Sequence, residues 1–377
     1  MACVTIPGLR YRDFSRSFHY REECRNVPLE GAIEVTNACN LSCRHCYIRD
    51  NDTRGELSYT QWRRIIDEIV EEGCLWLTFT GGEPLLRKDF LDIYLYAKRK
   101  GLLLVLFTNA TLIDRKIAEF LAEYRPFFLE ISLYGMSEDV YKSVSGSPEA
   151  YYRMKEALAL LRERNVLFKL KSVLTKDTIA QIPQMKAFAK GLGLEFRFDL
   201  LINPRIDGGK EPCEVRVSPE EGVALEMSDS ETAYYMEKDY FGLTQEVNPG
   251  LLFPCSAGKN SFNIDSKGRL SICNMVRHIN CDLTMMSFKE GWQSFPEILS
   301  RKAALNSRCA SCNLDSFCNR CPGWAMMEYR DEGALVEYAC EVTRAREQVI
   351  LERRRGNGNK SKEKLYQAEL KGSNLDS

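Results

Sequence analysis

Three cysteines close together, Cys39, Cys43 and Cys46, are the residues of this chain best suited to bind a metal cofactor. They stand in the segment NACNLSCRHCY, directly after a short apolar run. Structural zinc normally takes four protein ligands, whereas a four-iron cluster held by three thiolates keeps one iron free. The spacing therefore predicts a [4Fe–4S] cluster whose fourth iron is left for a substrate or cofactor.

A second motif, Thr80-Gly81-Gly82-Glu83-Pro84, ends the next apolar run. Glycines let the backbone approach a ligand closely and expose carbonyls to an ammonium group. Glu83 is either a further acceptor there or a residue that shapes the turn. An ordinary strand-to-helix turn has the same composition, because Gly-Gly and Pro are common in turns. The place of the motif, one strand after the cysteines, favours a ligand site.

Further polar residues stand where the following apolar runs end. They are Asn109 at the end of the third run, Ser132 in the fourth and Lys171 in the fifth. In a parallel sheet these ends meet at one edge, so the side chains are candidates to surround a cofactor. The alternative is that each only caps the element that follows it, which applies above all to Asn109 and Lys171.

A second group of cysteines occupies the later part of the chain. Its members are Cys255, Cys273, Cys309, Cys312, Cys318, Cys321 and Cys340, with Cys281 alongside. Paired C-x2-C spacings serve zinc as well as iron. Two structural zinc sites are therefore the alternative to iron–sulfur clusters here.

In this order, the two groups of cysteines resemble the radical S-adenosylmethionine (SAM) superfamily with a C-terminal SPASM extension. His45 occupies the place where that superfamily often has an aromatic residue, and Tyr47 follows the last cysteine. The resemblance implies that SAM binds the free iron, receives one electron, and gives a 5′-deoxyadenosyl radical that abstracts hydrogen from a substrate. The residues it implies for SAM binding are Tyr47, Thr80, Gly81, Gly82, Glu83, Pro84, Asn109, Ser132 and Lys171.

The resemblance also implies two auxiliary [4Fe–4S] clusters, three clusters in all. Cys309, Cys312, Cys318 and Cys340 would hold the distal cluster, and Cys255, Cys273 and Cys321 the nearer one. Two features depart from the family pattern. Two residues separate Cys318 from Cys321, one fewer than usual in the family. No cysteine stands a few residues before Cys255. The nearer cluster therefore has an open iron, or takes Cys213 or Cys281 as its fourth ligand.

The resemblance implies a ribosomally made peptide as substrate, since SPASM members are typically peptide maturases that form a thioether or other crosslink. Sulfatase-maturing members carry an Asp that can act as a base at the position of Asn274, and an asparagine cannot accept a proton at neutral pH. Sulfatase maturation is therefore disfavoured. About 30 residues precede the first strand, too few for an added leader-binding module, so a separate protein or residues 205–250 would bind a leader. A flavodoxin or ferredoxin would supply the electron.

Two other functions stay open at this point. One is a radical SAM dehydrogenase or epimerase acting on a small alcohol or an aminoglycoside-like sugar. The other is an electron-transfer or scaffold protein, which the intact Cys39 to Cys46 loop and GGEP motif disfavour. The fold alone does not separate these functions.

The elements that must position these residues alternate regularly. Apolar runs at 31–37, 74–80, 102–109, 127–135, 166–175 and 194–202 predict strands, and periodic segments at 58–73, 88–101, 114–125, 147–165 and 179–193 predict helices. Such alternation indicates a parallel sheet covered by helices on its outer face. We expect an α/β fold with a partial (β/α)6 TIM-like barrel, followed by a small cysteine-rich domain for the auxiliary clusters.

The expected domains follow from composition. They are an N-terminal extension at 1–30, the barrel at 31–203, a bridging region at 204–250, the auxiliary-cluster domain at 251–345 and a charged, frayed tail at 346–377. The 52 basic and 53 acidic side chains leave a net charge of −1, which predicts neither nucleic acid nor an anionic membrane as partner. Without a signal peptide or a long apolar run, the expected location is the cytoplasm.

Overall fold

A computed structural model of the chain describes residues 18, 26–48, 51–243, 250–304, 307–318 and 320–356. By its internal contacts the chain divides into two compact units. The first comprises residues 1–217, 248–311 and 320–336, and the second comprises residues 218–247, 312–319 and 337–377.

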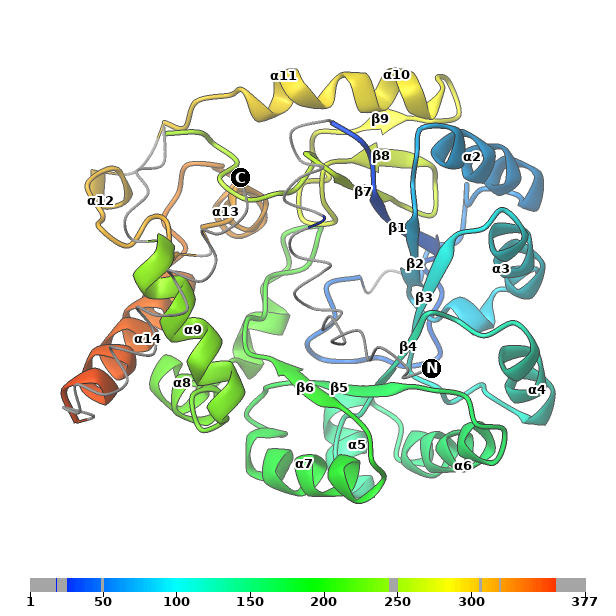
Figure 1. Cartoon of the computed structure of the whole chain (residues 1–377), viewed down its shortest axis with the longest axis horizontal. Helices are drawn as coiled ribbons and strands as arrows, with labels where there is room; N and C mark the ends of the chain where they lie inside the picture. Colours follow the sequence, from blue (N-terminus) through cyan, green and yellow to red (C-terminus); the bar gives the residue numbers. More distant parts are fainter. Residues whose placement is uncertain are drawn as a thin grey trace, which may run out of the picture. The chain divides into compact units, whose positions relative to one another are not determined.

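The first unit is built on a sheet whose strands surround a central space, with helices on the outside (Figure 1). Six parallel strands follow the predicted order: β1 Glu30–Thr36, β2 Trp76–Gly81, β3 Leu103–Thr108, β4 Phe128–Ser132, β5 Lys169–Val173 and β6 Phe196–Asp199. The predicted α/β barrel fold is therefore confirmed.

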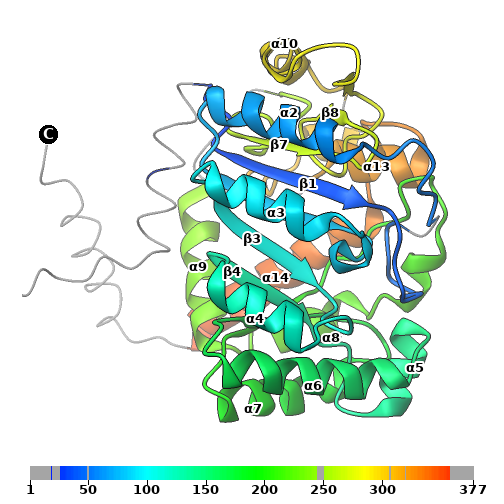
Figure 2. The ribbon, with the colours of Figure 1, turned by 90° about the vertical axis from the view of Figure 1, so that its right-hand side faces the viewer.

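Helices cover the outer face of these strands, as the side view shows (Figure 2). They are α2 Tyr59–Glu71, α3 Phe90–Arg99, α4 Arg115–Glu123, α6 Glu149–Glu163 and α7 Ile182–Gly191, all predicted, with short turns η1 Pro84–Leu86 and η2 Ile179–Gln181. Alternate strand residues face them: Phe79 of β2 packs its ring 5.4 Å from that of Phe90 in α3. The other residues of each strand face the central space, and these carry the polar groups of the site.

The helix α2 shows how local sequence determines an element. Ser58 caps its N-terminus in a capping box with Gln61, and Gly73 after its end takes a positive φ of 96°. Trp62 and Ile65 are fully buried on its inner face.

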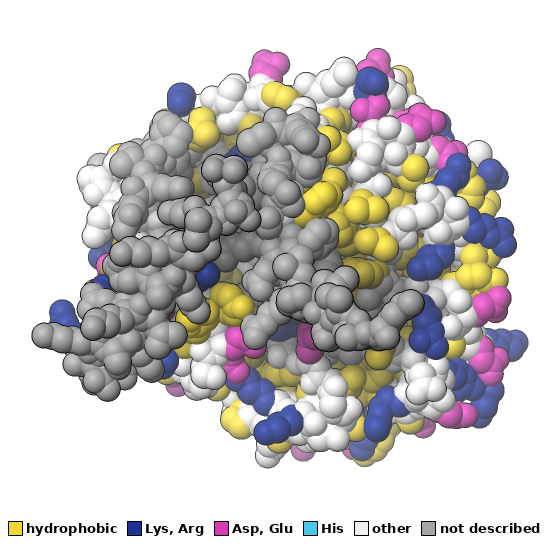
Figure 3. Space-filling view, in the orientation of Figure 1, with side chains coloured by type: hydrophobic (Ala, Val, Ile, Leu, Met, Phe, Trp, Pro, Cys, Tyr) yellow, Lys and Arg dark blue, Asp and Glu magenta, His cyan; other side chains and the backbone are white. Residues whose placement is uncertain are grey.

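On the outer side of α2 to α6, basic and acidic side chains are mixed along the rim (Figure 3), which agrees with the balanced net charge.

Three further strands extend the sheet from β1, and the sequence did not predict them. They are β7 Ser261–Ile264, parallel to β1, and β8 Arg269–Ser271 and β9 Cys281–Asp282, which continue antiparallel. They are two to four residues long, too short for a periodic signal. The first unit also contains the turn η3 Glu211–Val215 after β6 and four short helices: α10 Phe288–Gln293, α11 Phe295–Leu299, α12 Ser307–Ala310 and α13 Pro322–Tyr329.

The second unit contains α8 Pro219–Glu226, α9 Ser230–Leu243 and α14 Glu337–Gly356. Arg346 of α14 makes a bidentate contact with Glu226 at 2.8 and 2.9 Å, and Arg353 contacts Glu237 at 2.8 Å. These ion pairs tie α14 to α8 and α9. The charged residues from 346 to 356 are therefore helical instead of frayed, and the remainder of the predicted tail lies outside the described residues.

The predicted domain boundaries remain predictions. Most of the residues assigned to an auxiliary-cluster domain, 251–311 and 320–336, group with the barrel, because β7 hydrogen-bonds directly to β1. Most of the N-terminal extension and residues 244–249 of the bridge lie outside the described residues. No helix in the described part of the chain is long and apolar enough to cross a bilayer.

Candidate metal and cofactor site

The loop that carries Cys39, Cys43 and Cys46, here called the cluster loop, begins at the end of β1, at the carboxyl edge of the barrel. It is fastened to α5 (Glu138–Ser145) by two backbone hydrogen bonds, from Ser42 N to Ser145 O at 2.9 Å and from Arg44 N to Val144 O at 3.0 Å. The helix α5 was not predicted as a separate element. It fixes the path of a loop that has no regular structure of its own.

The three thiols lie close enough to influence one another electrostatically. Burial, followed by the nearby Cys46, raises the pKa of Cys43, and burial raises the pKa of Cys39. Burial therefore disfavours the thiolate forms of Cys39 and Cys43. Among the described residues, no three His, Cys, Asp or Glu side chains converge on a single ion. A four-iron cluster needs no such convergence, since each cysteine binds a separate iron.

Gly81 and Gly82 bring the end of β2 against the start of this loop. Gly82 N donates to Thr36 O and Glu83 N to Ala38 O, both at 2.8 Å. A Cβ at Gly82 would lie 2.2 Å from Ala38 O, and one at Gly81 would lie 2.3 Å from Thr36 O. Only glycine permits this approach. The GGEP motif therefore contacts the backbone immediately before Cys39, which fits a cluster with a ligand beside it.

Glu83 holds the end of β3 in place. Its carboxylate accepts hydrogen bonds from Thr108 Oγ1 at 2.7 Å, Asn109 N at 2.8 Å and Leu85 N at 3.1 Å. Its side chain is buried, and burial raises its pKa to about 7. Of the two roles predicted for Glu83, the structure shows the shaping of the turn. Pro84 is buried at the start of η1 directly after it.

Asn109 extends this arrangement to the cysteines. Its Nδ2 lies 3.0 Å from Asn40 Oδ1 and 4.0 Å from Cys39 Sγ, and its Oδ1 accepts from Thr111. The predicted alternative that Asn109 only caps the next element is incomplete, because its amide also reaches the cluster loop.

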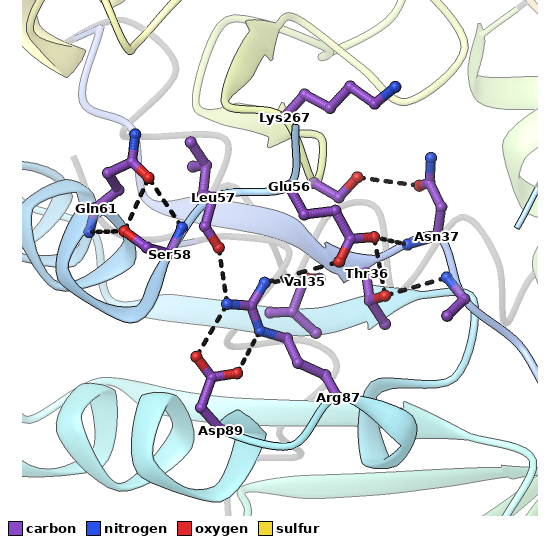
Figure 4. A network of polar contacts seen from close by, with 12 residues as sticks. Val35, Thr36, Asn37, Glu56, Leu57, Ser58, Gln61, Arg87, Asp89 and Lys267 are labelled. Carbon is purple, nitrogen blue, oxygen red and sulfur yellow. Dashed lines mark hydrogen bonds and ion pairs between the residues drawn. The ribbon is translucent and has the colours of Figure 1, made fainter. Parts of the chain in front are cut away.

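A second network of polar contacts surrounds the end of β1 (Figure 4). Glu56 accepts from Thr36 Oγ1 at 2.9 Å and from Asn37 N at 2.7 Å. Arg87 donates to Val35 O at 2.8 Å and Leu57 O at 2.7 Å while pairing with Asp89. The end of β1 is thus fixed just before Cys39.

Ser132 and Lys171 face each other across the β4–β5 pair. The Lys171 ammonium lies 4.3 Å from the centre of the Phe107 ring, and burial, followed by Arg197, lowers its pKa. His45 is near: burial, followed by Lys171, lowers its pKa to about 4, and its buried Nδ1 has no hydrogen-bond partner. This edge therefore offers a cation and an unsatisfied polar atom toward a ligand.

A buried ion pair missed by the sequence reasoning joins β1 to the segment after β8. Arg277 makes a bidentate contact with Glu34, which is fully buried, and its guanidinium lies 6.0 Å from the centre of the Tyr47 ring. A glutamate in the apolar run of β1 was the available signal, since a buried charge needs a partner. Tyr47 and Arg277 both line a cavity of about 360 Å³ beside the cluster loop.

The three cysteines predicted for the nearer auxiliary cluster are brought together in the first unit. Burial, followed by Cys273 and Cys255, raises the pKa of Cys321 to about 11. The contacts of the two proposed fourth ligands are with other residues: Cys281 Sγ lies 3.6 Å from Ser294 Oγ, and Cys213 lies near Arg216 and Glu328. The ligand set of the nearer cluster remains a prediction.

The set predicted for the distal cluster is divided between the units. Cys312, Cys318 and Cys340 belong to the second unit, where Arg344 interacts with Cys340 and Cys312, and Thr343 Oγ1 lies 3.6 Å from Cys318 Sγ. Cys309 belongs to the first unit. The four-cysteine set remains a prediction.

Comparison with known proteins agrees with this geometry. Residues 33–189 match the Radical SAM superfamily. Fe-coproporphyrin III synthase of Methanosarcina barkeri is 34% identical over 153 residues, which are 40% of this chain and 38% of that protein. The chain spans between about two fifths and one half of the length of the first three curated relatives it matches.

One relative aligns over most of its length. The PqqA peptide cyclase of Rhodopseudomonas palustris is 24% identical over 356 residues, covering 87% of this chain and 90% of that protein. This alignment is long enough to extend beyond the barrel into the later cysteine-rich part of the chain. The 153-residue match to Fe-coproporphyrin III synthase is too short to cover both parts.

Two solved structures share the fold. Streptococcus suis SuiB bound to the precursor peptide SuiA has a TM-score of 0.64 at 18% identity, covering 90% of this chain and 84% of that one. The structure of anSMEcpe with bound AdoMet and the Kp18Cys peptide has a TM-score of 0.66 at 17% identity, covering 86% of this chain and 98% of that one. At these identities the likeness concerns the fold alone.

Proposed function

Residues 33–189 of this chain are a radical SAM domain, and from this premise we propose that the protein cleaves SAM reductively and abstracts hydrogen from a ribosomally made peptide. The product we propose is a thioether or other crosslink. The observation that carries the proposal is the loop of Cys39, Cys43 and Cys46 held at the carboxyl edge of the barrel against Gly82.

The cluster and SAM together would supply a carbon radical by one-electron reduction of the sulfonium. The residues of the chain do the positioning. Cys39, Cys43 and Cys46 would hold the cluster, and the strand end at Thr80 and Gly81 would offer backbone carbonyls to the ammonium group of SAM. Lys171, which is paired with Ser132 across β4 and β5, would bind the carboxylate.

A peptide substrate is supported by the relative that aligns over nearly the whole chain, a PqqA peptide cyclase. The antilisterial bacteriocin subtilosin biosynthesis protein AlbA of Bacillus subtilis is a further relative, 25% identical over 169 residues. In our proposal, Cys255, Cys273 and Cys321 would hold an auxiliary cluster and leave one coordination position for a substrate thiolate. Cys309, Cys312, Cys318 and Cys340 hold the third cluster.

The partners follow from this proposal. A cytoplasmic flavodoxin or ferredoxin delivers the electron, and a separate leader-binding protein or the residues 205–250 present the peptide. A reductant is required because the chemistry begins with the transfer of one electron to SAM.

A non-peptide substrate is the second candidate. The relatives that match at higher identity include an AdoMet-dependent heme synthase of Methanosarcina barkeri, 32% identical over 170 residues. These shorter matches correspond in length to the barrel, which different reactions share. Turnover of a small alcohol, sugar or porphyrin without any peptide would favour this candidate.

Replacement of Cys43 by Ala tests the proposal. We expect wild-type protein, reconstituted anaerobically, to hold about twelve irons and to release 5′-deoxyadenosine from SAM, and C43A to lose about four irons and the cleavage. Cys74→Ala is the control, because Cys74 is buried beside Leu29 and Trp76, away from the loop. Undiminished 5′-deoxyadenosine from C43A would refute the assignment.

A further inference from the structure

The cavity beside the cluster loop is built from segments far apart in the sequence, all within the first unit. Tyr47 and Ile48 come from the end of the loop, and Arg205 to Asp207 come from the segment after β6. Ile206 N donates to Tyr47 O at 3.1 Å, which fixes these two walls together. The third wall is the β7–β8 hairpin with residues 277–280. The cavity has a volume of about 360 Å³, which suits one or two amino-acid residues.

Asn263 of β7 is the most informative residue of this cavity. Its side chain is 2% exposed, it lines the cavity, and neither Nδ2 nor Oδ1 has a hydrogen-bond partner. An unsatisfied buried amide costs about 1–3 kcal/mol, so such a group indicates a missing ligand. A carboxamide offers one donor and one acceptor side by side, which is the complement of a peptide group.

The charged side chains of the cavity indicate the sign of the ligand. Four permanent cations line it, Arg205, Lys267, Arg269 and Arg277, against two carboxylates, Asp207 and Asp265. Partners of three of these cations lie outside the lining: Glu34 is fully buried behind Arg277, Asp52 binds Lys267, and Glu211 lies 3.7 Å from Arg205.

Arg205 and Arg269 still have capacity to bind. Arg205 is paired with Asp207 at 2.5 Å, and its buried Nε lacks a hydrogen-bond partner. Arg269 is exposed, and its side chain lies on the same face of the hairpin as Asn263, because β8 pairs Ser271 with Asn263. A guanidinium N–H with no acceptor favours a carboxylate over a neutral group.

We propose that this cavity binds an acidic residue of the substrate peptide, with its backbone on Asn263 and its carboxylate on Arg205 and Arg269. The inference rests on the proposed peptide-modifying function and names the class of sequence that the site selects. It places the acidic residue beside Tyr47, at the edge of the cluster loop, so that a neighbouring residue of the peptide reaches the barrel.

The test uses the reconstituted holoenzyme with SAM and two fluorescein-labelled peptides, Gly-Glu-Gly-Glu-Gly amide and its Gln counterpart. We expect the Glu peptide to bind about tenfold more tightly in fluorescence anisotropy, the usual value of one charge-assisted contact. Arg269→Gln should remove most of this preference. Lys289→Gln, an exposed cation of α10 remote from the cavity, is the matched control and should keep it.

Asn263→Leu separates a binding role from a structural one. Because it removes two unsatisfied polar atoms, the variant should melt no lower than wild type, yet bind both peptides about tenfold more weakly. A lower melting temperature with unchanged peptide binding would mean that Asn263 supports the fold only. Glutarate serves as a free-acid probe: binding as tight as the Glu peptide, and unaffected by N263L, would assign the cavity to a small acid and overturn the proposal.

The two proposals fail differently. Equal binding of the Glu and Gln peptides, with SAM cleavage intact, would overturn the acidic-residue site and leave the proposed function standing. Absence of SAM cleavage in the iron-loaded protein would overturn the proposed function, while the two peptides would still report whether the cavity prefers the acid.

Discussion

Replacing Gly82 with Ala perturbs the contact on which the candidate site depends. The new Cβ would lie 2.2 Å from Ala38 O, and ordinary contact begins at 3.4 Å, so the two backbones must separate by about 1.2 Å. The hydrogen bonds from Gly82 N to Thr36 O and from Glu83 N to Ala38 O, both 2.8 Å, would then break.

The cost follows from these numbers. Two backbone hydrogen bonds contribute about 1 kcal/mol each, so the free energy of unfolding should fall by about 2 kcal/mol and the melting temperature by about 4–8 °C. Ala38 precedes Cys39, so the cluster moves relative to the end of β2. A displacement of this size in a reacting arrangement costs about a hundredfold in rate.

The assay measures 5′-deoxyadenosine release by anaerobic, reconstituted protein, together with thermal unfolding. Gly191→Ala is the matched control, because a Cβ there meets nothing within 4 Å and the residue has an ordinary φ. We expect wild-type SAM cleavage and stability from G191A. If G82A also cleaves SAM at the wild-type rate and melts at the wild-type temperature, the close approach of the two segments has no functional importance and our reasoning is wrong.

Three more predictions concern stability and turnover. Arg87→Met should lower the free energy of unfolding by about 3 kcal/mol in urea titrations, because it leaves two carbonyls and Asp89 without their donor. Arg54→Met, at a side chain 91% exposed, should leave the free energy of unfolding nearly unchanged, and equal effects of the two substitutions would contradict the network of Figure 4. The folded pKa of Glu83, about 7, is raised above its ordinary value of 4.5, so its contribution to stability is present below pH 4.5 and lost as the pH rises to 7. Metal-free wild type should therefore lose up to about 3 kcal/mol relative to Glu83→Gln between pH 4.5 and 8, and parallel curves would exclude a raised pKa. Cys312→Ala should retain SAM cleavage but form no peptide product; full product yield would show that the distal cluster is dispensable.

Local patterns were enough to predict the barrel and the cysteine loop. The helix α2 begins after Ser58 and ends before Gly73 as expected, because capping and periodicity depend on neighbours within a few residues. The loop of Cys39, Cys43 and Cys46 was found for the same reason: its ligands are close in the sequence. Its fastening to α5 was not, because the hydrogen bonds from Ser42 and Arg44 join segments about a hundred residues apart.

Only the tertiary structure decided the contacts between segments that are far apart in the sequence. Glu34 and Arg277 are 243 residues apart and meet because β7 adds to the sheet beside β1. The unsatisfied amide of Asn263 is likewise invisible in the sequence, since a residue lacks a partner only with respect to the groups that fold around it. The sequence by itself indicated which chemistry to expect, through the types and local spacing of its thiols and glycines. The fold determined where a substrate can bind, because a cavity is made of side chains whose separation along the chain carries no periodic signal.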